Sequence, residues 1–303
     1  MADFNPYLYS SNLYKKLENP PELRVIDCFC LWSDLLGFGN KFIEKNWNLN
    51  REDWEDIRER LLSAHSVAIQ NTSNKQRLLI LNDGIAKVCP FFKSDYQSLL
   101  LQSSFFFREA VMIHQEIKKK EASKGLPGAR TVVAFGNSAS YIEPEFKYDD
   151  YFFNYTKPDP DGLSNAAQSV GNPTVIYNPA ELQMNTAFSK AYMIESVGSK
   201  GGVAGSNIFI DESVIDVLKL LADKEEKGYI WVEMDNYIDF TIPRAGQQKE
   251  NVVIGFRFDK PFSPSGLRWN TNVYRVQRFY PWDELTSDFY FDLDDHDGWG
   301  PKN

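Results

Sequence analysis

The residues Arg24-Val-Ile-Asp-Cys-Phe-Cys-Leu-Trp-Ser-Asp34 form an almost continuously apolar stretch that ends in an acid. Such a run, rich in β-prone residues, is typical of a central strand that is covered on both faces. Leu35-Leu-Gly-Phe-Gly39 follows, and its two glycines allow the backbone to turn sharply. We therefore expect a buried strand over residues 24–34, with Asp34 at its carboxyl end.

A second acid lies at the tip of a predicted hairpin. In Gln76-Arg-Leu-Leu-Ile-Leu-Asn-Asp-Gly-Ile-Ala-Lys-Val88, two apolar arms flank Asn-Asp-Gly, which is a strong signal for a hairpin turn. Between the strand and the hairpin, Asn50 and the acids that follow it predict the start of an amphipathic helix. Four residues of this helix recur at helical spacing and are expected to face the sheet: Trp54, Ile57, Leu61 and His65.

Asp34 and Asp83 would meet at one edge of the sheet if the hairpin packs beside the first strand. Two ionised acids at such an edge repel each other, so one must take up a proton or a cation must bridge them. Hard cations such as Mg²⁺ and Mn²⁺ bind carboxylate oxygens and often keep positions for substrate phosphates. The pair therefore favours a two-carboxylate metal site for phosphoryl transfer. The alternative is that Asp34 caps a helix and Asp83 only makes a turn.

Three stretches, Ser33–Phe38, Leu81–Gly84 and Asn185–Glu195, resemble in this order the motifs of class III nucleotide cyclases. Ser33-Asp-Leu-Leu-Gly-Phe38 is similar to their Asp-Ile-x-Gly-Phe turn, and Leu81-Asn-Asp-Gly84 to their Ile-Gly-Asp hairpin, with Asn82 in place of Gly. Asn185-Thr-Ala-Phe-Ser-Lys-Ala-Tyr-Met-Ile-Glu195 resembles their later helix. It is more similar still to the Gly-Pro-Ala-x-x-x-Ala-Tyr-x-x-Glu form of the bacterial pyrimidine (uridylate and cytidylate) cyclases of Pycsar anti-phage defence. The resemblance covers about residues 24–211.

The order strand, helix, hairpin, helix, strand, insertion, helix and strand indicates an α+β sandwich, with one mixed sheet and helices on one face. The resemblance implies a ferredoxin-like cyclase catalytic core that forms a symmetric homodimer, with sites assembled across the subunit interface. We expect an N-terminal arm over residues 1–23 and the catalytic core over residues 24–228, with an insertion at 137–174. A C-terminal β extension and an acidic tail are expected over residues 229–303.

The resemblance also implies the reaction and the residues that perform it. Asp34 and Asp83, helped by the backbone carbonyl of Leu35, would hold two divalent cations, Mn²⁺ or Mg²⁺. The reaction would be attack of the ribose 3′-hydroxyl on the α-phosphate of a nucleoside triphosphate, with release of diphosphate. Four further residues are candidates for contacts with the substrate: Arg77, Arg130, Ser189 and Lys190. Ser189 and Met193 stand at the positions of the family's transition-state Asn and Arg, so the triphosphate needs another cationic partner.

Two departures from the family's motifs bear on the substrate. Leu79 stands where purine-specific cyclases carry a base-reading Lys, and Leu182 stands where they carry an acid. Because Leu cannot pair with a purine edge, we expect a pyrimidine nucleotide, UTP ahead of CTP. The cyclic mononucleotide product would act on a separate cyclic-nucleotide-sensing effector in antiviral defence. A non-catalytic, cyclase-like nucleotide-binding module is the alternative, whereas the hairpin motif of diguanylate cyclases is absent from the sequence.

Composition restricts the partners and the compartment. A net charge of −9 over 303 residues argues against a broad nucleic-acid-binding surface. No apolar run approaches the roughly 20 residues that a membrane-spanning helix needs, so we expect no membrane span. The cysteines Cys28, Cys30 and Cys89 are predicted to pack in the core, which fits a reducing, cytoplasmic location.

The remaining elements are predicted from periodicity. Helices are expected over residues 94–120 and 213–224, and a flexible connector over the glycine-rich residues 198–205. Strands are expected at residues 129–136, 207–211, 229–233, 237–242 and 252–258, and the tail from residue 282 is expected to wrap a surface. The insertion could be a lid, an interface arm or a disordered loop, and its acids Asp149 and Asp150 are expected to be solvated.

Overall fold

The computed structural model describes residues 23–73, 76–91, 96–140, 152–153, 175–176, 182, 184–243, 252–281, 289–294 and 299–301. By its contacts the chain divides into two compact units. The first comprises Met1–Ile26 and Ser138–Asn185, and the second comprises Asp27–Asn137 and Thr186–Asn303. None of the helices in the described ranges combines the length and the apolar character that crossing a membrane requires.

Little of the first unit is described. Its strand β5 (Phe152–Phe153) pairs antiparallel with β6 (Val175–Ile176), and Ser138 faces Asn185 in an isolated bridge. The predicted N-terminal arm, apart from residue 23, lies outside the described residues. So does most of the predicted insertion, including Asp149 and Asp150.

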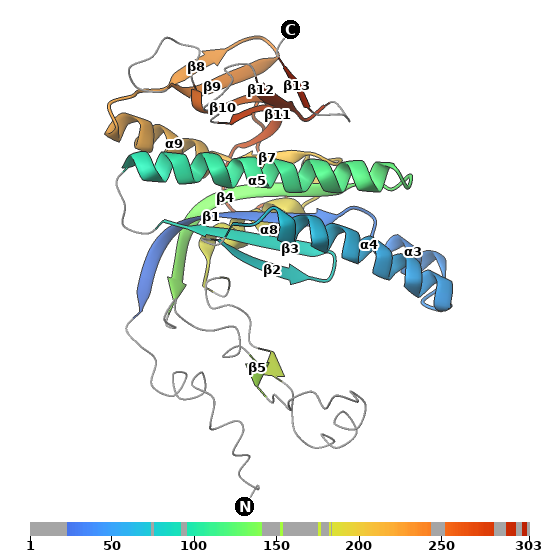
Figure 1. Ribbon diagram of the computed structural model, residues 1–303. Helices are drawn as coiled ribbons and strands as arrows, with labels where there is room; N and C mark the ends of the chain where they lie inside the picture. The colour runs from blue at the N-terminus through green and yellow to red at the C-terminus, as the bar shows by residue number, and fades with distance from the viewer. Residues whose placement is uncertain are drawn as a thin grey trace, which may run out of the picture. The chain divides into compact units, whose positions relative to one another are not determined.

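The second unit is built on one mixed sheet, as predicted, with the strand order β2-β3-β1-β4-β7-β11-β10-β9-β8 (Figure 1). Strands β12 and β13 extend from β11, while β4 and β7 run parallel. The strands of this sheet are β1 (Arg24–Leu35), β2 (Arg77–Leu81), β3 (Gly84–Pro90), β4 (Ala129–Ser140), β7 (Ile208–Asp211), β8 (Ile230–Glu233), β9 (Tyr237–Pro243), β10 (Val252–Asp259), β11 (Val273–Pro281), β12 (Phe289–Asp292) and β13 (Trp299–Pro301).

Five α-helices are described in this unit, and their places between the strands confirm the predicted order of elements. They are α3 (Asn40–Glu44), α4 (Arg51–Gln70), α5 (Tyr96–Ala122), α8 (Thr186–Ser196) and α9 (Glu212–Lys224). Helix α4 begins with a capping box, in which the Asn50 side chain accepts from the Asp53 amide and the Asp53 carboxylate accepts from the Asn50 amide. These two bonds satisfy amides that would otherwise lack partners at a helix start.

Helices cover both faces of the sheet, which corrects the expectation of helices on one face. The Phe29 ring contacts Phe106 of α5, whereas the Trp32 ring contacts Phe188 and Tyr192 of α8. Because successive side chains of a strand point to opposite faces, α5 and α8 must lie on opposite sides of β1. In Figure 1, α5 runs across one side of the sheet and α8 lies on the other.

The strands after residue 229 continue the same sheet. β11, a strand not predicted from the sequence, pairs antiparallel with β7 and so joins this region to the predicted catalytic core. One apolar cluster unites Phe29, Phe107 and Leu218 with Phe256 and Phe279 of the C-terminal strands. Fully burying each such side chain stabilises the fold by roughly 1.5–3 kcal/mol.

Helix α4 differs in part from its predicted orientation. Ile57 is buried as expected, but Trp54 is 54% exposed, and the small residues Ala64 and Ala68 are buried instead. The three cysteines are buried and form no disulfide, as their predicted packing role requires.

Candidate active site at the end of β1

Asp34 and the Asp83 turn lie side by side at one edge of the sheet. Asp34 is opposite Gly84 in the antiparallel pairing of β1 with β3, and the Leu35 amide donates to the Asp83 carbonyl at 3.3 Å. Gly84 makes this approach possible because a Cβ there would lie 2.2 Å from the Trp32 ring. The structure therefore brings together the two acids that the sequence singled out.

The Asp34 carboxyl is partly buried and surrounded by negative charge. Burial raises its pKa from the ordinary 3.8 to about 7, and the charges of Glu195 and Asp83 act in the same direction. Arg130 and Arg60 oppose this rise. No hydrogen bond from a described residue reaches the Asp34 carboxyl, so it is a candidate for a proton or a cation.

Arg130 approaches this edge from the start of β4. β4 runs antiparallel to β1, since the contacts pair Asn137 with Asp27 and Phe135 with Phe29. The Arg130 Nε and Nη2 groups donate to Glu195 Oε1 at 2.8 Å and 2.5 Å. Its Nη1 group donates to a backbone carbonyl, that of Val203, at 3.0 Å.

Glu195 lies at the end of α8 and is only 6% exposed. Glu195 ends the Asn185–Glu195 helix motif, although no role was predicted for it from the sequence. Its position in that motif was the available signal. Its effect on Asp34 arises because α8 runs opposite to β4, with Thr186 beside Asn137 and Glu195 beside Arg130.

Arg60 of α4 was not predicted as a site residue. Its guanidinium makes a bidentate ion pair with Glu121 and also donates to the Leu36 carbonyl at 2.8 Å. This second bond ties α4 to the loop that directly follows Asp34. No sequence pattern could indicate Arg60, because its role depends on how α4 and α5 pack.

The donors at this edge suit a hard divalent cation. Two carboxylates are available, and the Leu35 carbonyl, which accepts from the Phe38 amide at 3.3 Å, keeps a second lone pair. Within the described ranges, no group of three or more His, Cys, Asp or Glu side chains is arranged for a metal ion. A cation held by Asp34 and Asp83 would therefore keep positions for water or phosphate, as Mg²⁺ commonly does.

The other predicted substrate contacts lie on α8 and β2. The Lys190 ammonium donates to the Phe135 carbonyl at 3.1 Å and lies 3.9 Å from the Asp211 carboxylate. Phe135 is five residues along β4 from Arg130, which corresponds to about 16 Å at ~3.3 Å per residue. Ser189 is exposed on α8 beside Lys190.

Arg77 is also distant from the turn. It pairs with Val88 at the start of β2, at the end of the hairpin opposite Asp83. Within one chain, the structure therefore brings Asp34, Leu35, Asp83 and Arg130 together, whereas Arg77 and Lys190 contact other parts of the sheet.

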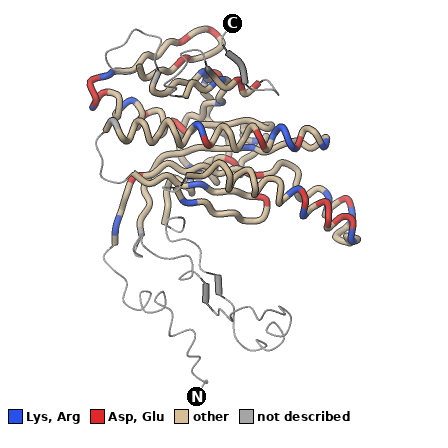
Figure 2. Tube along the Cα trace, viewed as in Figure 1, with Lys and Arg blue, Asp and Glu red and all other residues tan. Residues whose placement is uncertain are grey.

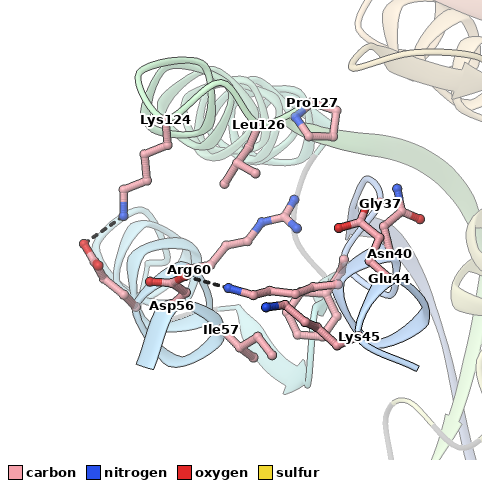
Figure 3. A pocket seen from close by; sticks show the side chains of 13 residues that line it. Gly37, Asn40, Glu44, Lys45, Asp56, Ile57, Arg60, Lys124, Leu126 and Pro127 are labelled. Carbon is pink, nitrogen blue, oxygen red and sulfur yellow. Dashed lines mark hydrogen bonds and ion pairs between the residues drawn. The ribbon is translucent and has the colours of Figure 1, made fainter. Parts of the chain in front are cut away.

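A pocket of about 580 Å³ lies beside the site, lined by the loop after Asp34, α3, α4 and residues 124–127 (Figure 3). Its cations are paired: Lys41 contacts Asp56 at 2.6 Å and Lys124 contacts Glu59 at 2.8 Å. Figure 2 shows the same mixture of acids and bases along α3 and α4. The pocket therefore offers a phosphate little unpaired positive charge, and the candidate active site remains at the Asp34–Asp83 edge.

No protein-family model matches the chain, and no curated protein matches it. Solved structures similar to it include the adenylyl cyclase CyaB from P. aeruginosa, which is 10% identical over 84% of this chain and 95% of that one, with a TM-score of 0.40. The guanylyl cyclase Cya2 is 13% identical over 88% of this chain and 96% of that one, with a TM-score of 0.41.

A third structure is the guanylyl cyclase domain of the RhoGC fusion protein from the aquatic fungus Blastocladiella emersonii. It is 10% identical over 84% of this chain and 97% of that one, with a TM-score of 0.37. At this level of similarity, the function of the chain has to be argued from its own residues.

Proposed function

We propose that the protein is a nucleotide cyclase that converts UTP to 3′,5′-cyclic UMP and diphosphate. The observation that carries the proposal is the convergence of Asp34 and Asp83 at one sheet edge. There the partly buried Asp34 carboxyl, without a hydrogen-bond partner among the described residues, has two further acids near it. Such a concentration of negative charge favours cation binding, and the order of motifs around it resembles that of class III cyclases.

Asp34, Asp83 and the Leu35 carbonyl would hold two Mg²⁺ or Mn²⁺ ions. When bound, such ions lower the pKa of the attacking 3′-hydroxyl and neutralise the triphosphate and the leaving diphosphate. The chain's own contribution includes Arg130, which uses three of the five N–H groups of a guanidinium on Glu195 and Val203. The two remaining N–H groups are available to phosphate oxygens, so Arg130 is our candidate for the cationic partner that Met193 cannot supply.

The substrate proposal depends on the side chains that would face the base. Leu79 pairs with Ala86, which pairs with Trp32, so Leu79 shares a face of the sheet with Asp34. An apolar side chain at this place gives no hydrogen bond to a purine edge. UTP is therefore proposed first, and CTP, giving cyclic CMP, second.

We propose a homodimer as the active form. Apolar side chains on the Asp34 face of the sheet are exposed, among them Leu81 (41%), Tyr192 (48%) and Met193 (39%). A second copy of the chain would cover them and could bring its own Ser189 and Lys190 to the site. The cyclic nucleotide would then act as a second messenger on a separate effector in antiviral defence.

The direct test is to incubate the purified protein with each of the four nucleoside triphosphates and Mn²⁺ or Mg²⁺, and to identify the products by mass spectrometry. We expect cyclic UMP and diphosphate from UTP. Asp34→Ala and Asp83→Ala should each abolish turnover while the protein remains folded. Asp27→Asn is the matched control, because Asp27 lies on the same strand but is exposed at its far end.

Each alternative gives a different result. Cyclisation of CTP alone would favour the second candidate, and exclusive cyclisation of ATP or GTP would refute a pyrimidine substrate. Nucleotide binding without any product would favour a cyclase-like binding module. Full activity in the Asp34→Ala or Asp83→Ala variant would remove the metal site from the mechanism.

A further inference from the structure

The hairpin turn that carries Asp83 has a side-chain donor of its own. Asn82 and Asp83 connect Leu81 with Gly84, and Asn82 adopts a left-handed conformation with φ of 55°. Glycine adopts this conformation without strain, and asparagine tolerates it. The Asn82 side chain is therefore not required by the backbone, yet its Nδ2 group donates to Asp83 Oδ1 at 3.0 Å.

Two neighbouring elements hold the backbone of the same turn. The His65 Nε2 atom lies 2.8 Å from the Asn82 carbonyl, and because a carbonyl only accepts, this nitrogen carries the proton. On the other side, the Leu35 amide donates to the Asp83 carbonyl at 3.3 Å. The turn is thus fixed to α4 and to the end of β1, so the Asn82 amide is held close to the carboxylate.

We infer that Asn82 is a positioning residue for the divalent cation at the proposed cyclase site, and the inference rests on that proposed function. Its amide engages Oδ1 of Asp83 and so restricts the rotation of the carboxylate, while Oδ2 receives no hydrogen bond from a described residue and stays available to the ion. Outer residues that orient a metal-binding carboxylate commonly change metal affinity by about 10–100-fold when they are replaced. His65 supports the same arrangement through the backbone of the turn.

A purely structural role for Asn82 would be to stabilise the turn. The variant Asn82→Gly separates the two roles, because glycine keeps the left-handed conformation and removes only the amide donor. Asn46→Gly is the matched control. Asn46 has nearly the same backbone conformation, with φ of 50°, and lies in the turn after α3. Urea unfolding of both variants checks that the fold is kept.

The measurement is the binding of Mn²⁺ alone to the full chain, followed by the electron paramagnetic resonance signal of the free ion. We expect Asn82→Gly to bind Mn²⁺ about tenfold more weakly than the wild type. We expect Asn46→Gly to stay within about twofold, and Asp83→Ala to define the loss of a direct ligand. In turnover assays, Asn82→Gly should raise the KM for Mn²⁺ by more than it lowers kcat.

The outcomes distinguish this inference from the proposed function. Wild-type affinity in Asn82→Gly, or an equal loss in Asn46→Gly, overturns the positioning role and leaves the cyclase proposal intact. If the wild type binds no more Mn²⁺ than Asp83→Ala does, the metal site fails and the positioning role fails with it.

Discussion

Replacing Asp34 with Asn should stabilise the metal-free protein at alkaline pH and change little at acidic pH. The pKa of this carboxyl is about 7 in the folded chain and near 3.8 in an unfolded one. Between these values the folded protein keeps the proton while the unfolded chain releases it, so the free energy of unfolding falls as the pH rises from about 4 to 7. Asn does not ionise, so the variant should not show this loss.

The size of this change in unfolding free energy follows from the part of the pH range, between the two pKa values, in which unfolding can be measured. Between pH 5.5 and the folded pKa of about 7 lie roughly 1.5 pH units, which correspond to about 2 kcal/mol at 1.36 kcal/mol per unit. The carboxyl is not fully buried, so solvent screening reduces this to roughly 1 kcal/mol. The difference in unfolding free energy between the variant and the wild type should therefore grow by about this amount from pH 5.5 to pH 8.5.

The assay is urea unfolding at both pH values in the presence of a chelator, followed by tryptophan fluorescence. Asp27→Asn is the control, since it makes the same substitution at an exposed acid on the same strand. Replacing the chelator with Mn²⁺ at pH 8.5 should restore stability to the wild type more than to Asp34→Asn. An Asp34→Asn variant that is equally destabilised at both pH values would refute the reasoning, because the carboxylate would then have a favourable partner in the folded protein.

Two further substitutions test packing, one beside the site and one in the core on the other face of the sheet. Gly84→Ala should lower the free energy of unfolding by at least roughly 1–3 kcal/mol, because its Cβ would lie 2.2 Å from Trp32, whereas Gly39→Ala, with open space at that position, should cost little in the same urea assay. Equal stability of these two variants would contradict the close contact. Lys87→Ala should cost about 3–5 kcal/mol, because it leaves its partner Glu109 without the buried ammonium. A Lys87→Met, Glu109→Leu double variant should recover much of this loss. If it does not, the loss comes from the packing of the Lys87 methylene groups rather than from the unpaired charge.

The order of elements was predictable because each boundary has a local cause. The apolar run over β1 ends at Asp34, and the Asn-Asp-Gly turn makes the hairpin. What could not be predicted depends on contacts between distant segments. β11 is a strand because it pairs with β7. Helix α8 lies on the face opposite α5 because its aromatic side chains contact Trp32 rather than Phe29.

The same division applies to the candidate site. Asp34 and Asp83 could be selected from sequence because each acid ends or turns a local element. The protonation state of Asp34 could not be predicted, since the pKa of its carboxyl depends first on burial and then on Glu195, which lies in α8. A local sequence pattern gives no information about such a neighbour, because α8 contacts β1 only in the folded chain.

The position of Arg130 shows why contacts between distant segments matter for the mechanism. From sequence it was one of four candidates for a substrate contact, and its strand position alone did not distinguish it from the others. In the folded chain, Glu195 and the Val203 carbonyl hold its guanidinium beside Asp34, whereas Lys190 contacts the Phe135 carbonyl, five residues farther along β4. If the substrate's phosphates bind near Asp34, Arg130 is the candidate that one chain already holds in place, whereas Arg77 and Lys190 would have to come from a second copy of the chain.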